Sequence, residues 1–190
     1  YTTLFRSNRV WLGGDKGRLF LLDQSSGRYH SIKIDCLRSP NDQLQVITGN
    51  EHFIYLGFQY SGIIRYDLSK KSFSNLSLGV DEREVVFVHD ILIDENILWV
   101  ATEKGLYSYD ETTKRTTRLK RDYFDPLSLS DNAIYSVYKD RDNGLWVGTY
   151  FGGINYVSLV QNRFIESYYP LIDKFSLKGK AVREICQDKI

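Results

Sequence analysis

The hydrophobic pattern between residues 132 and 164 consists of short apolar runs separated by polar breaks. Apolar runs cover 134–138, 145–149 and 154–157, and a polar turn at 140–144 separates the first two. The turn ends in Asn143-Gly144, a dipeptide that accommodates positive φ at both central positions of a tight hairpin. Runs of about five residues bounded by such turns are typical of strands rather than helices. The segment therefore predicts a meander of antiparallel strands.

The same pattern occurs four times, and each copy carries an aromatic residue followed two places later by a small one. These pairs are Trp11 and Gly13, Tyr55 and Gly57, Trp99 and Ala101, and Trp146 and Gly148. The aromatic positions are 44, 44 and 47 residues apart. Residues two apart in a strand face the same side, so we expect the aromatic ring to be buried between two sheets while the small residue leaves room for the adjacent sheet.

A period near 45 residues with four strand-like runs in each unit is typical of β-propeller blades. The sequence thus predicts an all-β fold, a β-propeller fragment of four antiparallel four-stranded blades plus the first strand of a fifth. We expect the blades at about 1–37, 44–78, 85–119 and 133–169, and the additional strand at 182–188. A complete four-bladed ring is the alternative. Because the chain contains no Met and ends within a fifth copy, we expect it to be part of a longer protein.

The fourth copy resembles the two-component regulator propeller repeat. The matching positions are Asn132, Asp140, Gly144, Trp146, Gly148, Thr149, Gly152, Gly153 and Asn155. The second copy departs from the repeat at Tyr55 and Phe58, and the third departs from it at Ala101. The resemblance extends over essentially the whole chain in four copies of uneven quality, of which the fourth is the most specific.

The resemblance implies the periplasmic sensor region of a hybrid two-component system histidine kinase from gut Bacteroidetes. It implies a non-catalytic segment of a membrane-anchored parent chain, which contributes to recognition of an oligosaccharide derived from a polysaccharide and to signal transmission. Two other functions stay open. The first is a propeller-type enzyme acting on glycans, and the second is a purely architectural blade array that serves dimerisation.

Two sets of loops share one face of a propeller, those between second and third strands and those between successive blades. The aromatic, amide and charged side chains of these loops are the candidate ligand-binding residues, because aromatic rings stack on sugars and polar groups bind their hydroxyls. They are Phe58, Gln59, Tyr60, Arg121, Tyr123, Tyr150 and Phe151. The alternative is that these aromatic rings fill gaps between blades. We also expect self-association, since exposed strand edges and apolar faces recruit partners.

Composition adds few candidates for other chemistry. The net charge of +1 gives no reason to expect nucleic acid as a partner, and no apolar stretch approaches the roughly 18 residues needed to cross a bilayer. The histidines, His30, His52 and His89, lack metal-ligand spacing, so neither a metal nor a cofactor is expected. Cys36 and Cys186 are expected to be free thiols. No two carboxylates can be paired from the sequence, whereas a glycosidase would require such a pair.

Overall fold

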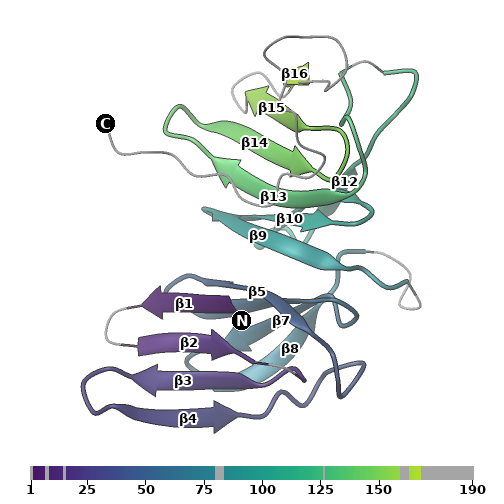
Figure 1. The fold of residues 1–190 in the computed structure, drawn as a ribbon. Coiled ribbons are helices and arrows are strands. Elements are labelled where there is room, and N and C mark those ends of the chain that lie inside the picture. The colour runs from purple at the N-terminus through teal and green to yellow at the C-terminus, as the bar shows by residue number, and fades with distance from the viewer. Residues whose placement is uncertain are drawn as a thin grey trace. The chain divides into compact units, whose positions relative to one another are not determined.

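A computed structural model of the protein describes residues 2–6, 9–14, 16–79, 84–125, 127–158 and 163–167. Within these ranges the chain forms sixteen strands and no helix. The strands make four antiparallel sheets of four, each a meander in which sequence neighbours pair (Figure 1). The predicted all-β fold of four four-stranded blades is thereby confirmed. The additional strand predicted at 182–188 lies outside the described residues.

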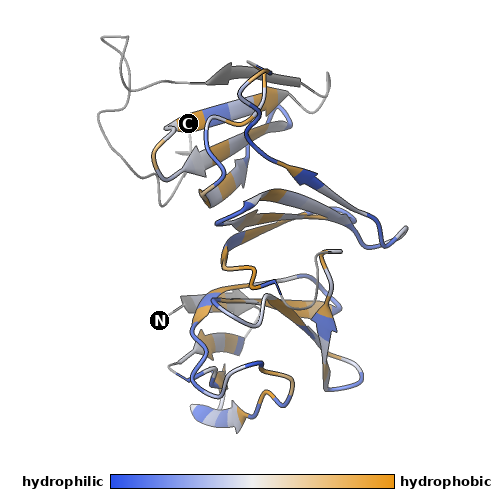
Figure 2. Cartoon of the chain, turned by 90° about the vertical axis from the view of Figure 1, so that its right-hand side faces the viewer, coloured by the Kyte–Doolittle hydropathy of each residue, from blue (hydrophilic) through white to orange (hydrophobic). Residues whose placement is uncertain are grey.

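The first sheet contains β1 (Thr2–Arg6), β2 (Arg9–Gly13), β3 (Leu19–Asp23) and β4 (Arg28–Ile32). The second contains β5 (Leu44–Gly49), β6 (Phe53–Phe58), β7 (Ile63–Asp67) and β8 (Ser72–Leu76). The third contains β9 (Val88–Asp94), β10 (Ile97–Thr102), β11 (Gly105–Asp110) and β12 (Thr116–Leu119). The fourth contains β13 (Ile134–Lys139), β14 (Gly144–Thr149), β15 (Ile154–Ser158) and β16 (Arg163–Ser167). In Figure 2 the strands carry both apolar and polar residues, and β6 and β14 are buried at five of their six positions.

The chain divides into two compact units, Tyr1–Ile93 and Asp94–Ile190. In the first unit, the first two sheets pack face to face around an apolar core. Trp11 of β2 contacts Tyr66 of β7 edge to face, with 5.7 Å between the ring centroids. The central strand β6 is buried over its last five residues. The core of the second unit includes Leu98, Leu106, Ile134 and Leu145, all almost inaccessible to solvent.

The four aromatic positions differ in burial. Trp11 and Tyr55 are buried, as expected, whereas Trp99 and Trp146 are only partly buried. The indole N–H of Trp146 donates to Oδ2 of Asp140 at 2.8 Å, and its ring lies 4.8 Å from that of Tyr156. The expectation that Trp146 is buried between sheets is therefore wrong, because its indole reaches back to the hairpin turn. The small residues Gly13, Gly57, Ala101 and Gly148 are all buried.

The hairpin turn after β13 also differs in detail from its prediction. Asn143 adopts positive φ, at 62°, whereas Gly144 does not and instead begins β14. A side chain at Gly144 would collide with the ring of Tyr156 on the neighbouring strand. Glycine is required at this position for the close approach of that ring and not for a left-handed backbone.

Candidate ligand-binding site

In the first unit, the loop between β6 and β7 carries three of the predicted ligand-binding residues. Phe58 is completely buried, since it pairs with Leu44 across β5 and β6 and belongs to the apolar core. The prediction that Phe58 is exposed on the loop face is therefore wrong. At this position the alternative applies, in which the aromatic ring fills space inside the fold. Gln59 is partly buried, and its N–H donates to the carbonyl of Gln43 at 3.1 Å. Tyr60 is 45% exposed.

A buried carboxylate that the sequence analysis missed holds this loop in place. Asp42 lies in the loop between β4 and β5 and is completely buried. Its Oδ1 accepts the N–H of Tyr60 at 3.0 Å, and its Oδ2 accepts the N–H of Ser61 at 2.7 Å. The Ser61 hydroxyl in turn accepts the N–H of Arg38 at 2.9 Å. The loop before β5 and the loop after β6 are thus fixed to each other, which places Tyr60 and Arg38 on one side of the unit.

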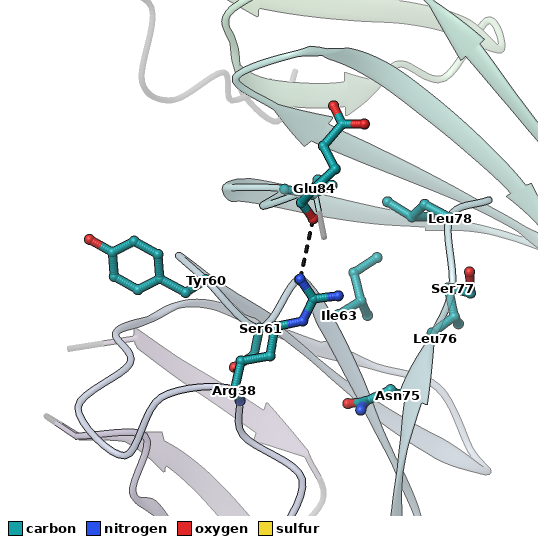
Figure 3. Close-up of a pocket in the computed structure, with 11 residues that line it drawn as sticks. Arg38, Tyr60, Ser61, Ile63, Asn75, Leu76, Ser77, Leu78 and Glu84 are labelled. Atoms are coloured by element: carbon teal, nitrogen blue, oxygen red, sulfur yellow. Dashed lines mark hydrogen bonds between the residues drawn. The ribbon is translucent and has the colours of Figure 1, made fainter. Parts of the chain in front are cut away.

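A cavity of about 520 Å³ opens beside this pair of loops. Its lining residues are Arg38, Tyr60, Ser61, Gly62, Ile63, Asn75, Leu76, Ser77, Leu78, Glu84 and Val86. Figure 3 shows the Arg38 guanidinium between the loop that carries Ser61 and the backbone of Glu84. Nη1 of Arg38 donates to the Glu84 carbonyl oxygen at 3.2 Å. The cavity therefore combines apolar side chains, uncharged polar groups, the cation of Arg38 and the acidic residue Glu84. Apolar walls with a few polar groups are typical of small-molecule sites.

In the second unit, the loop at 120–131 carries Arg121 and Tyr123. The Arg121 guanidinium carbon lies 4.4 Å from the centroid of the Tyr123 ring, which is 82% exposed. The N–H of Arg121 donates to Oδ1 of Asn132 at 2.8 Å. The Ser128 hydroxyl closes the loop: its oxygen accepts the N–H of Asp122 at 2.9 Å, and its O–H donates to the carbonyl of Asp122 or of Asp125, at 2.9 and 2.8 Å. An arginine and an aromatic ring are thus presented together on a loop with its own hydrogen bonds.

The loop between β14 and β15 carries the other two predicted residues, Tyr150 and Phe151. The Tyr150 ring stacks on that of Tyr135, with centroids 5.1 Å apart, and meets the Phe151 ring edge to face at 4.2 Å. Phe151 is 60% exposed, whereas Tyr150 is less exposed because these neighbours cover part of its ring. The N–H of Phe151 donates to Oδ2 of Asp131 at 3.1 Å, an arrangement like that of Asp42 and the loop after β6. Phe151 is therefore the better placed of the two for stacking on a ligand.

The motif residues of the fourth copy tie together the two loops of the second unit. Asn155 is completely buried; its Oδ1 accepts the N–H of Ser130 at 2.9 Å, and its Nδ2 donates to the Ser130 hydroxyl at 2.8 Å. The Thr149 hydroxyl donates to the Gly153 carbonyl at 2.9 Å. A Cβ at Gly152 would collide with the Ser130 side chain. These residues position the candidate binding loops, and Asn155 and Thr149 do so from buried positions.

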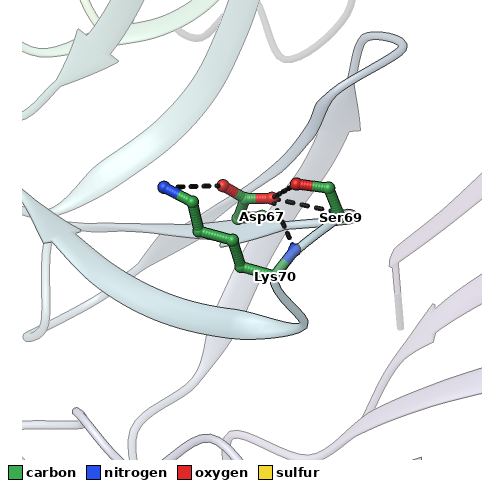
Figure 4. Close-up of polar contacts among 3 residues, drawn as sticks. All are labelled: Asp67, Ser69 and Lys70. Atoms are coloured by element: carbon green, nitrogen blue, oxygen red, sulfur yellow. Dashed lines mark hydrogen bonds and ion pairs between the residues drawn. The ribbon is translucent and has the colours of Figure 1, made fainter.

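The hairpin turns between the third and fourth strands of three sheets share a hydrogen-bonding pattern, in which an aspartate side chain accepts backbone N–H groups of the turn. In Figure 4, Oδ1 of Asp67 accepts the N–H groups of Ser69 and Lys70 at 2.9 and 3.0 Å and the Ser69 hydroxyl at 2.6 Å. Asp23 and Asp110 accept corresponding backbone N–H groups in the first and third sheets. The side-chain hydrogen bond from Ser69 lowers the pKa of Asp67, and backbone hydrogen bonds chiefly lower the pKa of Asp23 and Asp110. These carboxylates stabilise turns and stay ionised at neutral pH.

Other candidate chemistry is limited in the part of the chain that the structure describes. No three His, Cys, Asp or Glu side chains there are grouped as a metal site would require. Cys36 is a partly buried free thiol whose pKa is raised by burial, while Cys186 lies outside the described ranges. No helix among the described residues is long and apolar enough to cross a membrane.

A sequence model of the two component regulator propeller matches residues 128–151, which confirms the resemblance seen in the fourth copy. No curated protein matches the chain. The chain is 24% identical to the extracellular domain of a protein described as a hybrid two component system, BT3049 from B. thetaiotaomicron, with a TM-score of 0.75. The alignment covers 99% of this chain and 24% of that one.

A second extracellular domain of the same description, from BT4673 of B. thetaiotaomicron, is 22% identical with a TM-score of 0.76. The alignment covers 96% of this chain and 24% of that domain. The computationally designed Ika4 protein is 15% identical with a TM-score of 0.58, over 83% of this chain and 89% of that one. The chain thus spans about a quarter of the length of the two bacterial domains. At these identities, the similarity establishes the shared fold.

Proposed function

We propose that this chain, which carries a two component regulator propeller repeat at residues 128–151, is part of the extracytoplasmic sensor region of a hybrid two-component system. The observation that carries the proposal is the combination of this repeat with a fold shared over nearly the whole chain with two extracellular domains of such systems. In this proposal the region lies in the periplasm, is non-catalytic, and belongs to a membrane-anchored histidine kinase.

The ligand in this proposal is an oligosaccharide released from a polysaccharide. Support comes from the loops between second and third strands and between successive sheets, which present exposed rings beside polar groups. Tyr60 stands beside a cavity in the first unit, while Tyr123 and Phe151 are exposed in the second. Sugar rings stack their C–H groups on such aromatic faces and hydrogen-bond to neighbouring amides and charges.

The proposed role requires loops that keep their shape when empty, since ordering a loop on binding reduces affinity. Buried Asp42 and Asn155 each fix a candidate loop through hydrogen bonds to its backbone. Binding would then stabilise an arrangement of sheets that already exists. A ligand that contacts loops of two successive sheets would stabilise one packing arrangement of those sheets, so binding would be coupled to that packing.

Calorimetric titration of oligosaccharides into the complete ectodomain tests this function. We expect saturable binding without turnover, and we expect Tyr60→Ala or Phe151→Ala to weaken it, each stacked ring contributing about 0.5–1.5 kcal/mol. Leu127→Ala serves as the control, because this side chain is exposed in the loop that carries Arg121 and Tyr123 without being a candidate. Hydrolysis products in the titrated sample would favour the glycan-active enzyme instead. Saturable binding that neither variant changes would remove these loops from the site.

A further inference from the structure

The cavity of the first unit contains an arginine without a carboxylate partner among the residues that the structure describes. The side chain of Arg38 makes one hydrogen bond there, from Nη1 to the Glu84 carbonyl oxygen at 3.2 Å. Figure 3 shows the Glu84 carboxylate directed away from the guanidinium. A guanidinium carries several N–H donors in a planar fork that matches a carboxylate. Most of these donors are therefore available to a ligand in the cavity.

The remaining walls define what else such a ligand must carry. Ile63, Leu78 and Val86 are buried apolar residues that line the cavity, and they suit the C–H groups of a sugar ring. Asn75 and Ser77, at the end of β8 and just after it, are exposed polar residues that can bind hydroxyl groups. A purely apolar ligand would displace water from these polar groups without replacing its hydrogen bonds, and a neutral sugar would leave the guanidinium without a counter-charge.

The backbone at Arg38 is fixed by the framework of the unit. The N–H of Arg38 donates to the Ser61 hydroxyl, and the N–H of Ser61 donates to buried Asp42. The loop that holds Tyr60 at the rim of the cavity is anchored by the same carboxylate. A charge that is held in place before binding loses less freedom on binding, so this arrangement favours recognition of one oriented group.

We propose that this cavity binds a negatively charged sugar unit, a uronate, with the Arg38 guanidinium pairing its carboxylate. The proposal rests on the proposed sensor function and narrows its ligand to an acidic oligosaccharide. The volume of about 520 Å³ lies within the range of roughly 300–1,000 Å³ that is typical of small-molecule sites. Apolar wall residues contact the ring, Asn75 and Ser77 bind its hydroxyls, and Tyr60 covers the open side.

The test is a calorimetric titration of the whole chain with disaccharides in matched acidic and neutral pairs. The acidic members contain galacturonate, glucuronate or mannuronate, and each neutral counterpart has the same linkage. We expect at least one acidic disaccharide to bind more tightly than its neutral counterpart, and its affinity to fall with added salt. Arg38→Gln should weaken this binding about tenfold or more, because a charge-assisted hydrogen bond is lost. Arg38→Lys should restore part of the loss.

Arg28→Gln is the matched control, since Arg28 is an exposed arginine on β4 that does not line the cavity. It should leave the affinity unchanged. Binding of neutral disaccharides that Arg38→Gln does not alter would overturn the acidic-sugar inference and leave the sensor function standing. Binding of an acidic disaccharide with the same affinity in Arg38→Gln would overturn the assignment of the cavity. A chain that binds no acidic disaccharide also overturns the inference, and the sensor function is then judged separately from titration of the complete ectodomain.

Discussion

Replacing Gly57 by alanine should destabilise the first unit, because two rigid side chains occupy the space that the new methyl group needs. Gly57 is the small residue that follows Tyr55 on β6 and is buried. A Cβ at this position would lie 2.6 Å from Cγ1 of Val46 and 2.6 Å from Cγ1 of Val88. Carbon atoms pack at about 3.5–4.0 Å, so both valines must move by about 1 Å.

Neither valine can move easily. Val88 is completely buried, and β-branched side chains are restricted at χ1. Overpacking of this kind costs about 1–3 kcal/mol. Removing glycine lowers the entropy of the unfolded chain and returns about 0.4–1 kcal/mol, which reduces the net effect but does not cancel it. The φ of Gly57 is not in the left-handed region, so alanine meets no backbone strain there.

Equilibrium unfolding in urea measures the effect as a lower transition midpoint at unchanged slope. Gly57→Ala should be combined with Val88→Ala, which removes one of the two overlapping methyl groups. We expect the double variant to be more stable than the sum of the single effects predicts, with a coupling of about 0.5–3 kcal/mol. Gly27→Ala is the control for backbone strain alone, since φ is 66° there and no atom lies within 4 Å of the added Cβ. Additive effects of Gly57→Ala and Val88→Ala would refute close packing as the reason for glycine.

Four further predictions concern stability and association. Trp146→Phe should cost about 1–3 kcal/mol in urea unfolding, because the ring is kept and the hydrogen bond to the Asp140 carboxylate is lost. Asn155→Ala should cost about 1–3 kcal/mol by leaving the buried N–H of Ser130 without an acceptor, whereas a stable variant would show that the loop has another anchor. The pKa values of the three turn aspartates are lowered in the fold, so their stabilisation is present above the ordinary value of about 3.9 and is lost as the pH falls through the lower folded values. Asp67→Ala should reduce this acid sensitivity in melting curves recorded at decreasing pH. Sedimentation velocity should show concentration-dependent self-association, and a single monomeric species at all concentrations would contradict it.

The sheets could be predicted because their determinants are local. Short apolar runs and turn dipeptides are readable within a single copy, and the repeat near 45 residues is readable from the spacing of successive copies. The errors arose where a residue's surroundings depend on the fold. Phe58 looked like a loop residue, but its pairing with Leu44 extends β6 by one position and directs the ring into the core. Trp146 looked like its counterpart Trp11, but a carboxylate six residues earlier accepts its N–H and keeps it at the surface of the hairpin.

The candidate site was only partly predictable for the same reason. Tyr60, Tyr123 and Phe151 were identified because exposed aromatic residues in loops are visible in a sequence. Arg38 and Asp42 were not predicted. The contact between the loop before β5 and the loop after β6 depends on the fold, and the sequence does not show which loops it brings together. The available signal was an aspartate shortly before the inner strand in two copies, at Asp42 and Asp131. In both copies this carboxylate accepts an N–H from the loop after the second strand.

These observations separate two kinds of residue that share the same loops. Asn155, Thr149 and Asp131 satisfy backbone groups of the loops and thereby fix their path. Phe151, in contrast, donates its backbone N–H to that framework, while its ring is 60% exposed and packs against the neighbouring Tyr150 ring. A sheet framework of this type allows ligand-facing side chains to change while the loop path is retained. The residues that carry the family resemblance in the fourth copy therefore belong to the scaffold. Under the proposed sensor function, we expect ligand preference to depend on neighbouring positions that the repeat does not specify.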